Sequence, residues 1–202
     1  MKNRLFKFLA IIILSFVMIT RCSERERLTQ PNEEQNDVLL PLKVGNTWLY
    51  NLCIKKDNGE YDLIDEVRYL KINGIITIDD HLYFKSDDNF ILGPFYHELG
   101  SSTIILENRS NGLYVGDSLL NDTTVDWKFY FKYPVENNDS YSYHNYSIEV
   151  TREKIETYYH VEFDCILYSF ESWQVYVVPG KGIVRFTESK MLIHDLKSTY
   201  LK

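Results

Sequence analysis

Residues 48–55 read Trp-Leu-Tyr-Asn-Leu-Cys-Ile-Lys, and this stretch decides the fold. Trp48, Tyr50, Leu52 and Ile54 occupy every second position, so they share one face if the chain is extended. The 3.6-residue period of a helix persists almost nowhere in the rest of the chain. The stretch therefore predicts a β-strand with one apolar, aromatic face.

The chain repeats this pattern in short pieces. Its 202 residues include 16 Tyr, 11 Phe and 3 Trp, and such aromatic residues favour pleated surfaces. Polar clusters with Asn-Gly or Asp-Asn units, such as 56–59 and 109–112, are typical of hairpin turns. Further strands are expected at 61–72, 74–78, 81–85, 103–107, 113–115, 127–133, 141–151, 155–168, 173–178, 182–187 and 191–200.

We therefore predict an all-β fold with little helix. An antiparallel meander would form either a strongly curved open barrel or a two-sheet sandwich. Residues 151–159 are the stretch where a helix competes best, because they contain good helix formers.

The N-terminus is typical of an exported protein. Residues 1–7 carry three basic side chains, and the 13-residue run 8–20 is almost entirely apolar. That run matches the core of a signal peptide and is too short for the ~20 residues of a membrane-spanning helix. It leads to Cys22 in a pattern that resembles a bacterial lipobox, although Arg21 stands where lipoboxes have a small residue. The resemblance implies a signal peptide at 1–21 and a diacylglycerol on the Cys22 thiol. An uncleaved anchor, or an ordinary signal peptide with an unmodified Cys22, is the alternative.

The segments after Cys22 differ sharply in composition. Residues 22–37 are dense in mixed charge, Gln and Asn, so we expect a disordered tether. Residues 38–202 are long enough for one sizeable core, and we expect a single β domain there. The whole chain has a net charge of −7. Four of its 22 basic residues and none of its 29 acidic residues lie in 1–21, which leaves −11 on the remainder. Nucleic acid is therefore not an expected partner.

Two segments of the domain echo each other over ten residues, Pro41–Tyr50 and Pro134–Tyr143. Gly45 corresponds to Asn138, and these are the residue types that best tolerate a positive φ. We therefore expect the same turn to lead into a strand twice. The domain would then consist of two related halves, 38–133 and 134–202.

These segments resemble motifs of small, uncharacterised Bacteroidetes-type envelope lipoproteins. Such proteins share a PLxxGNxWxY segment, a weaker copy of it and a PGxGxV turn, here Pro179–Val184. They also carry an F-x-C-x-x-Y element, here Phe163–Tyr168. The resemblance implies a lipid-anchored envelope β-domain at the outer membrane, on its periplasmic or surface face. It brings no catalytic residues. It also implies candidate O-glycosylation at Ser118 and Thr123, which follow aspartates on an expected loop.

No pattern for a cofactor or a metal is evident. The five histidines are scattered and do not match a metal-binding spacing. The Gly180-Lys-Gly182 unit lies outside any phosphate-binding frame. Carboxylate pairs for glycoside cleavage cannot be nominated from the sequence, because their geometry is three-dimensional. We expect neither a cofactor nor a metal site, and we do not expect an enzyme.

Cys53 and Cys165 remain after Cys22. In an oxidising compartment they can form a disulfide. The alternative is two buried small hydrophobic residues, which the apolar neighbours of Cys165 favour.

Tyr141, Tyr143, Tyr146 and Tyr158 form a second group of interest. Tyrosine stacks on sugars and is frequent in protein interfaces, so these four residues are a candidate aromatic binding surface. Structural positions on edge strands are the alternative.

The leading functional hypothesis is a non-catalytic lipid-anchored envelope protein. It would attach to the membrane through its lipid and would be structural or bind a glycan, an apolar ligand or an envelope protein. The alternatives are a glycan-processing hydrolase and an interaction subunit of a surface complex.

Overall fold

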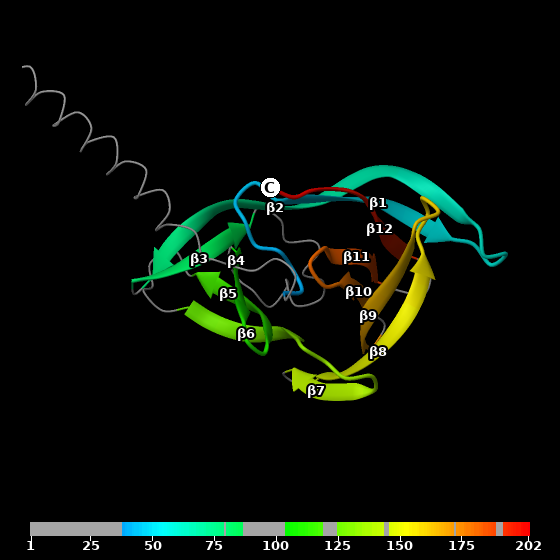
Figure 1. Ribbon diagram of the computed structural model, residues 1–202. Helices are drawn as coiled ribbons and strands as arrows, with labels where there is room; N and C mark the ends of the chain where they lie inside the picture. Colours follow the sequence, from blue (N-terminus) through cyan, green and yellow to red (C-terminus); the bar gives the residue numbers. More distant parts are fainter. Residues whose placement is uncertain are drawn as a thin grey trace, which may run out of the picture. The chain divides into compact units, whose positions relative to one another are not determined.

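The computed structural model describes residues 38–78, 80–86, 104–118, 125–143, 146–171, 173–188 and 192–202 (Figure 1). Within these ranges every regular element is a strand. They are β1 (Thr47–Lys55), β2 (Tyr61–Ile78), β3 (His81–Ser86), β4 (Ile104–Arg109), β5 (Gly112–Ser118), β6 (Val125–Lys132), β7 (Asp139–Tyr143), β8 (Tyr146–Glu156), β9 (Glu162–Phe170), β10 (Trp173–Val178), β11 (Gly182–Thr187) and β12 (Leu192–Tyr200).

The strands form one antiparallel sheet rather than two packed sheets. Their order is β6-β5-β4-β3-β2-β1-β12-β11-β10-β9-β8-β7. Two six-stranded meanders therefore meet where β1 pairs with β12, and the sheet curves into a nearly closed barrel (Figure 1). This confirms the predicted all-β meander and selects the curved barrel over the sandwich.

The two ends of the sheet, β6 and β7, are joined by side chains. Tyr141 in β7 donates a hydrogen bond from its hydroxyl to the Tyr130 carbonyl in β6, at 2.9 Å. Tyr168 in β9 donates to the Lys132 carbonyl at 2.6 Å, and Lys132 Nζ lies 2.6 Å from Asp139 Oδ2. Side chains therefore hold the β6–β7 seam, whereas a backbone ladder with one register shift, between Leu49 and Tyr50, holds β1 against β12.

The predicted apolar face of β1 is buried at Trp48, Tyr50 and Leu52, but Ile54 at its end is exposed, and the opposite face of the strand is also buried. Trp48 and Tyr50 are completely buried, and so is Cys53 on the other side of the strand. Asn51 is also buried, and it lies opposite Asp195 of β12. The carboxylate of Asp195 accepts a hydrogen bond from the backbone N–H of Tyr158, so the β8–β9 connection packs against this second face.

Several predicted boundaries need correction. The strands expected at 61–72 and 74–78 are one strand, β2, which continues through Gly74. The strand expected at 141–151 is two strands, with Tyr143 of β7 opposite Tyr146 of β8. The helix alternative for 151–159 is wrong, because β8 continues to Glu156 and pairs there with β9.

Candidate functional site

The two strongest sequence motifs contact each other in the core. Trp48 donates a hydrogen bond from its indole Nε1 to the Lys181 carbonyl at 2.6 Å. Tyr50 donates from its hydroxyl to the Ile183 carbonyl at 2.9 Å. Gly182 has a φ of +97°, and a Cβ atom there would lie 2.6 Å from Leu40 Cδ1. The PLxxGNxWxY and PGxGxV motifs therefore serve one structural contact.

Asn46, the asparagine of the PLxxGNxWxY motif, forms hydrogen bonds to two distant parts of the chain. Its side chain is fully buried, and Nδ2 donates to the Pro41 carbonyl at 2.7 Å. Its Oδ1 accepts from the backbone N–H of Lys202 at 2.8 Å, and its own carbonyl accepts from Ile72 N–H at 2.9 Å. One side chain thus connects the segment before β1 with the C-terminal end of the chain.

The echoed turn has the predicted conformation in both copies. Gly45 and Asn138 have φ values of +93° and +65°. In each copy the next residue donates back across the turn, from Asn46 N–H to the Lys43 carbonyl and from Asp139 N–H to the Glu136 carbonyl. The second turn has a partner of its own, because Asp139 forms an ion pair with Lys132. The hydrogen bond from Lys132 lowers the pKa of the Asp139 carboxyl. The division into two related halves remains a prediction.

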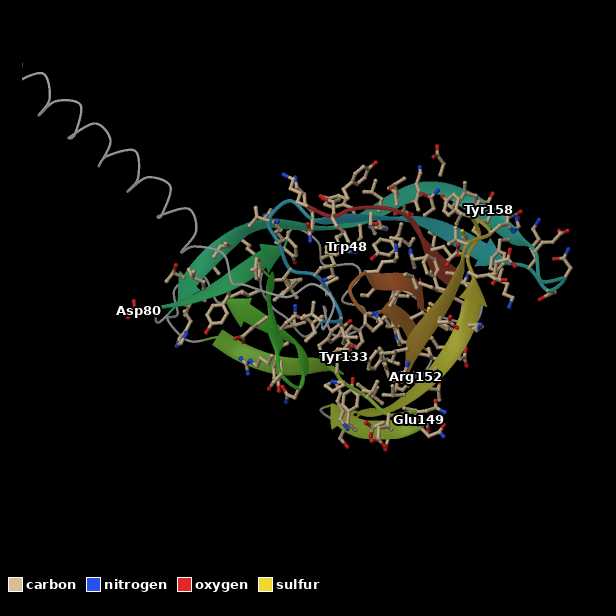
Figure 2. All side chains as sticks on the ribbon, viewed as in Figure 1. Trp48, Asp80, Tyr133, Glu149, Arg152 and Tyr158 are labelled. Atoms are coloured by element: carbon tan, nitrogen blue, oxygen red, sulfur yellow. The ribbon has the colours of Figure 1, made fainter. Side chains whose placement is uncertain are left out.

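Two of the four tyrosines of the candidate binding surface, Tyr141 and Tyr158, lie far apart. Tyr141 packs against the core at the β6–β7 seam, and Tyr158 follows the far end of β8. In Figure 2, Tyr133 at the seam and Tyr158 are labelled well apart. Tyr141 pairs with Ile148 of β8. The strand continues for eight more residues to Glu156, which is a distance of about 26 Å, and Tyr158 lies beyond that end. Tyr143 and Tyr146 are opposite each other as backbone positions, and their side chains lie outside the described part of the structure.

Cys53 and Cys165 are both free and buried. Burial raises the pKa of the Cys53 thiol to about 11, with a further rise from Asp195 and an opposing effect from Arg185. Burial likewise raises the pKa of the Cys165 thiol to about 12. Both thiols are therefore protonated at neutral pH and poorly reactive. The structure shows the buried alternative, without the disulfide.

Of the remaining predicted site residues, the structure describes only Ser118. Cys22 and Thr123 fall outside the described residues, as do the signal peptide and the tether. Ser118 is the last residue of β5, opposite Val125 of β6, rather than part of a loop. In the described ranges no group of three His, Cys, Asp or Glu side chains is placed to hold a metal ion.

A buried ion pair is the first feature that sequence reasoning missed. Arg185 donates from Nε and Nη2 to the two carboxylate oxygens of Asp195, at 2.5 and 2.7 Å. Nη2 also donates to the Glu156 carbonyl at 3.0 Å, so the pair ties the end of β8 to β11 and β12. Burial alone would lower the pKa of Arg185, but the hydrogen bond and charge of Asp195 outweigh it and raise that pKa. All these donors and acceptors are used within the fold, which indicates a structural role.

A second missed feature is a titratable cluster around His194. This side chain is 2% exposed, and its Nε2 lies 3.4 Å from Glu188 Oε1. Burial, with a smaller effect from Arg68, lowers the pKa of His194 to about 4. Burial also raises the pKa of Glu188, against an opposing effect of Arg68. Arg68 forms an ion pair with Glu66. The cluster therefore combines a neutral imidazole with a half-buried carboxyl group.

The third missed feature is an apolar strip on the outward face of β2. Exposure alternates from Leu63 to Ile72, and the exposed positions include Leu63 at 43%, Val67 at 46% and Tyr69 at 46%. Tyr200 at the end of β12 is 61% exposed and lies opposite Thr47 of β1, which is also paired with Lys71 of β2. We call Leu63, Val67 and Tyr69 the β2 strip. Alternation was visible in the sequence, but which face points outward depends on the closure of the barrel.

The described part of the chain contains no helix that is long and apolar enough to cross a membrane. Comparison with known proteins adds no identification: no family model, no curated protein and no solved structure matches this chain.

Proposed function

We propose that this protein is a non-catalytic, lipid-anchored component of the cell envelope that acts by binding a protein partner. The anchoring part of the proposal rests on the basic residues and apolar run of 1–21 and on the lipobox-like position of Cys22. The binding part rests on the β2 strip.

The β2 strip supports binding because its composition is unusual for an outward strand face. Antiparallel sheets commonly place apolar side chains inward and polar side chains outward. Here Leu63, Val67 and Tyr69 are each more than two-fifths exposed in one strand. Aromatic side chains are enriched in protein interfaces, and Val67 and Tyr69 are neighbours on this face of β2.

The binding test changes the strip without touching the core. The full chain is extracted from native membranes with mild detergent, and its migration on a native gel is compared with that of a Val67→Asp/Tyr69→Asp variant. The wild-type chain should run in a species larger than one chain, and the variant should run as a monomer. Lys154→Asp is the control, because that exposed side chain lies on β8. Identical migration of wild type and strip variant would contradict the proposal.

The anchoring test is independent of the strip. Intact-mass analysis of the mature chain should begin at Cys22 with added acyl mass, and Cys22→Ala should remove that mass. An unmodified Cys22 in the mature protein would exclude lipid anchoring while leaving the binding proposal intact.

A glycan-processing hydrolase is the second candidate, and the His194 cluster is the observation that favours it. Burial raises the pKa of Glu188, which is the direction that favours a general acid, and the neutral imidazole of His194 lies beside it. If the protein cleaves envelope glycans, Glu188→Gln should abolish the release of reducing ends from isolated cell-wall material. Equal release by both forms would remove this candidate.

A further inference from the structure

We infer that the partner at the β2 strip is a second copy of this chain, with the two β2 strands paired antiparallel. This inference rests on the proposed binding function and names its partner. It is carried by the order of side chains on the outward face of β2, which reads Leu63, Asp65, Val67, Tyr69 and Lys71.

The outward face of β2 is complementary to itself. Asp65 and Lys71 lie three residues to either side of Arg68, and Val67 and Tyr69 lie one residue to either side. A two-fold axis that crosses β2 at Arg68 therefore places Asp65 of each copy opposite Lys71 of the other. Val67 is then opposite Tyr69. Opposite charges and aromatic–β-branched pairs are favourable cross-strand neighbours, and two-fold interfaces require such self-complementarity.

The backbone of β2 offers an edge for this pairing. Residues Tyr61–Lys71 pair with β1, whereas the pairing of β2 with β3 begins only at Ile72. Among the described residues, no strand lies on the other side of 61–71. Eleven residues span about 36 Å of strand, and an unpaired edge of that length is a template for pairing with another chain.

The charges on the outward face are available for the second copy. Lys56 pairs with Asp62 and Arg68 pairs with Glu66, but Asp65 and Lys71 make no ion pair with any described residue. Both side chains are exposed. Arg68 of one copy would be opposite Arg68 of the other. The ion pair of each Arg68 with Glu66 of the same copy offsets the repulsion between the two arginines.

Disulfide trapping tests the register directly. In the full chain, Arg68→Cys places two thiols opposite each other on the two-fold axis. Directly opposite residues in antiparallel strands have Cα atoms about 4.5–5.5 Å apart, which suits a disulfide. Mild oxidation of membranes should therefore give a dimer on a non-reducing gel. Thr77→Cys is the matched control, because that exposed position of β2 already pairs with Leu82 of β3. The wild-type chain gives the background from its native cysteines.

A charge swap tests the same contact without cysteine. Asp65→Lys or Lys71→Asp alone creates two like-charge pairs in each dimer, and we expect about tenfold weaker self-association of the purified full chain. The double variant Asp65→Lys/Lys71→Asp restores both pairs in reversed order and should return self-association to near the wild-type value. Sedimentation of the detergent-solubilised chain measures all four forms.

The outcomes separate this inference from the proposed function. A dimer trapped at position 68 but not at 77, with rescue by the double variant, supports the inference. A native complex that depends on the β2 strip but contains one copy of this chain and a different protein overturns the inference and leaves the proposed function standing. A chain that stays monomeric with an intact or a disrupted strip overturns both.

Discussion

The indole of Trp48 and the carbonyl of Lys181 are 133 positions apart in the chain, and a 2.6 Å hydrogen bond joins them. Trp48 is near the start of β1, and Lys181 lies in the turn between β10 and β11. The bond therefore connects the first strand of the domain to the hairpin of the PGxGxV motif. The two motifs with the strongest sequence signal belong to the same part of the core.

Replacing Trp48 with Phe tests this hydrogen bond. Because Trp48 is completely buried, the change leaves the Lys181 carbonyl without its donor and also removes apolar volume. We expect the free energy of unfolding to fall by about 2–4 kcal/mol. Urea denaturation measures it, with Lys154→Ala as an exposed control. A loss no larger than that of the control would show that the bond contributes little.

Gly182→Ala tests the contact between the two motifs. The new Cβ would require a strained backbone, and it would lie 2.6 Å from Leu40 Cδ1. Gly59→Ala is the matched control, since Gly59 has a similar φ of +86° with nothing within 4 Å of its Cβ position. We expect a loss of about 1 kcal/mol for Gly59→Ala and at least about 2 kcal/mol more for Gly182→Ala. Leu40→Ala should lessen the cost of Gly182→Ala in the double variant. Equal costs at the two glycines would contradict the close contact.

The Arg185–Asp195 pair should behave as a unit. Arg185→Leu or Asp195→Leu alone leaves one buried charge unpaired, and we expect each to lower the free energy of unfolding by about 3–5 kcal/mol. The double variant removes both charges and should cost clearly less than the sum of the single variants. A double-mutant cycle from chemical denaturation measures the coupling. Additive losses would mean that the two side chains contribute independently.

His194 should make stability depend on pH. Its pKa is about 4 in the folded protein and 6.5 as a free side chain, so the unfolded state binds the proton more readily between these values. Its contribution is fully present above pH 6.5 and is lost as pH falls towards 4, by about 3 kcal/mol in total. Glu188, whose pKa is raised, contributes in the opposite sense.

His194→Phe isolates this dependence. Thermal unfolding between pH 4 and pH 7.5 should show a weaker decline towards low pH in the variant than in the wild-type chain. His160→Phe is the control, because that side chain is 88% exposed. A wild-type decline that persists unchanged in His194→Phe would assign the pH dependence to other groups.

Local rules predicted the turns that contain Gly or Pro, but they missed the turn at 157–161, which lies inside the strand expected at 155–168. The bounds of β10 and β11 are confirmed at 173–178 and 182–187, because Pro179, Gly180 and Gly182 mark the turn between them and both glycines have positive φ. Gly45 and Asn138 were identified for the same reason. The break between β7 and β8 was missed because residues 141–151 lack a Gly or Pro to mark it.

Features that depend on long-range register could not be predicted. Arg185 and Asp195 are directly opposite each other only because of the particular pairing of β11 with β12. The β2 strip is exposed because its side chains point away from the face of β2 on which Leu70 and Ile72 are completely buried. An alternating strand specifies two faces, but the closure of the sheet decides which one is inside.

The most direct test of the central claim is site-specific photo-crosslinking in native membranes. A photoreactive amino acid replaces Tyr69 in the β2 strip of the full chain, and the same amino acid replaces Lys154 on β8 as the reference. Binding through the strip predicts a discrete crosslinked protein from position 69 and little product from position 154. No product from position 69, or the same products from both positions, would contradict the claim that this protein acts through the outward face of β2.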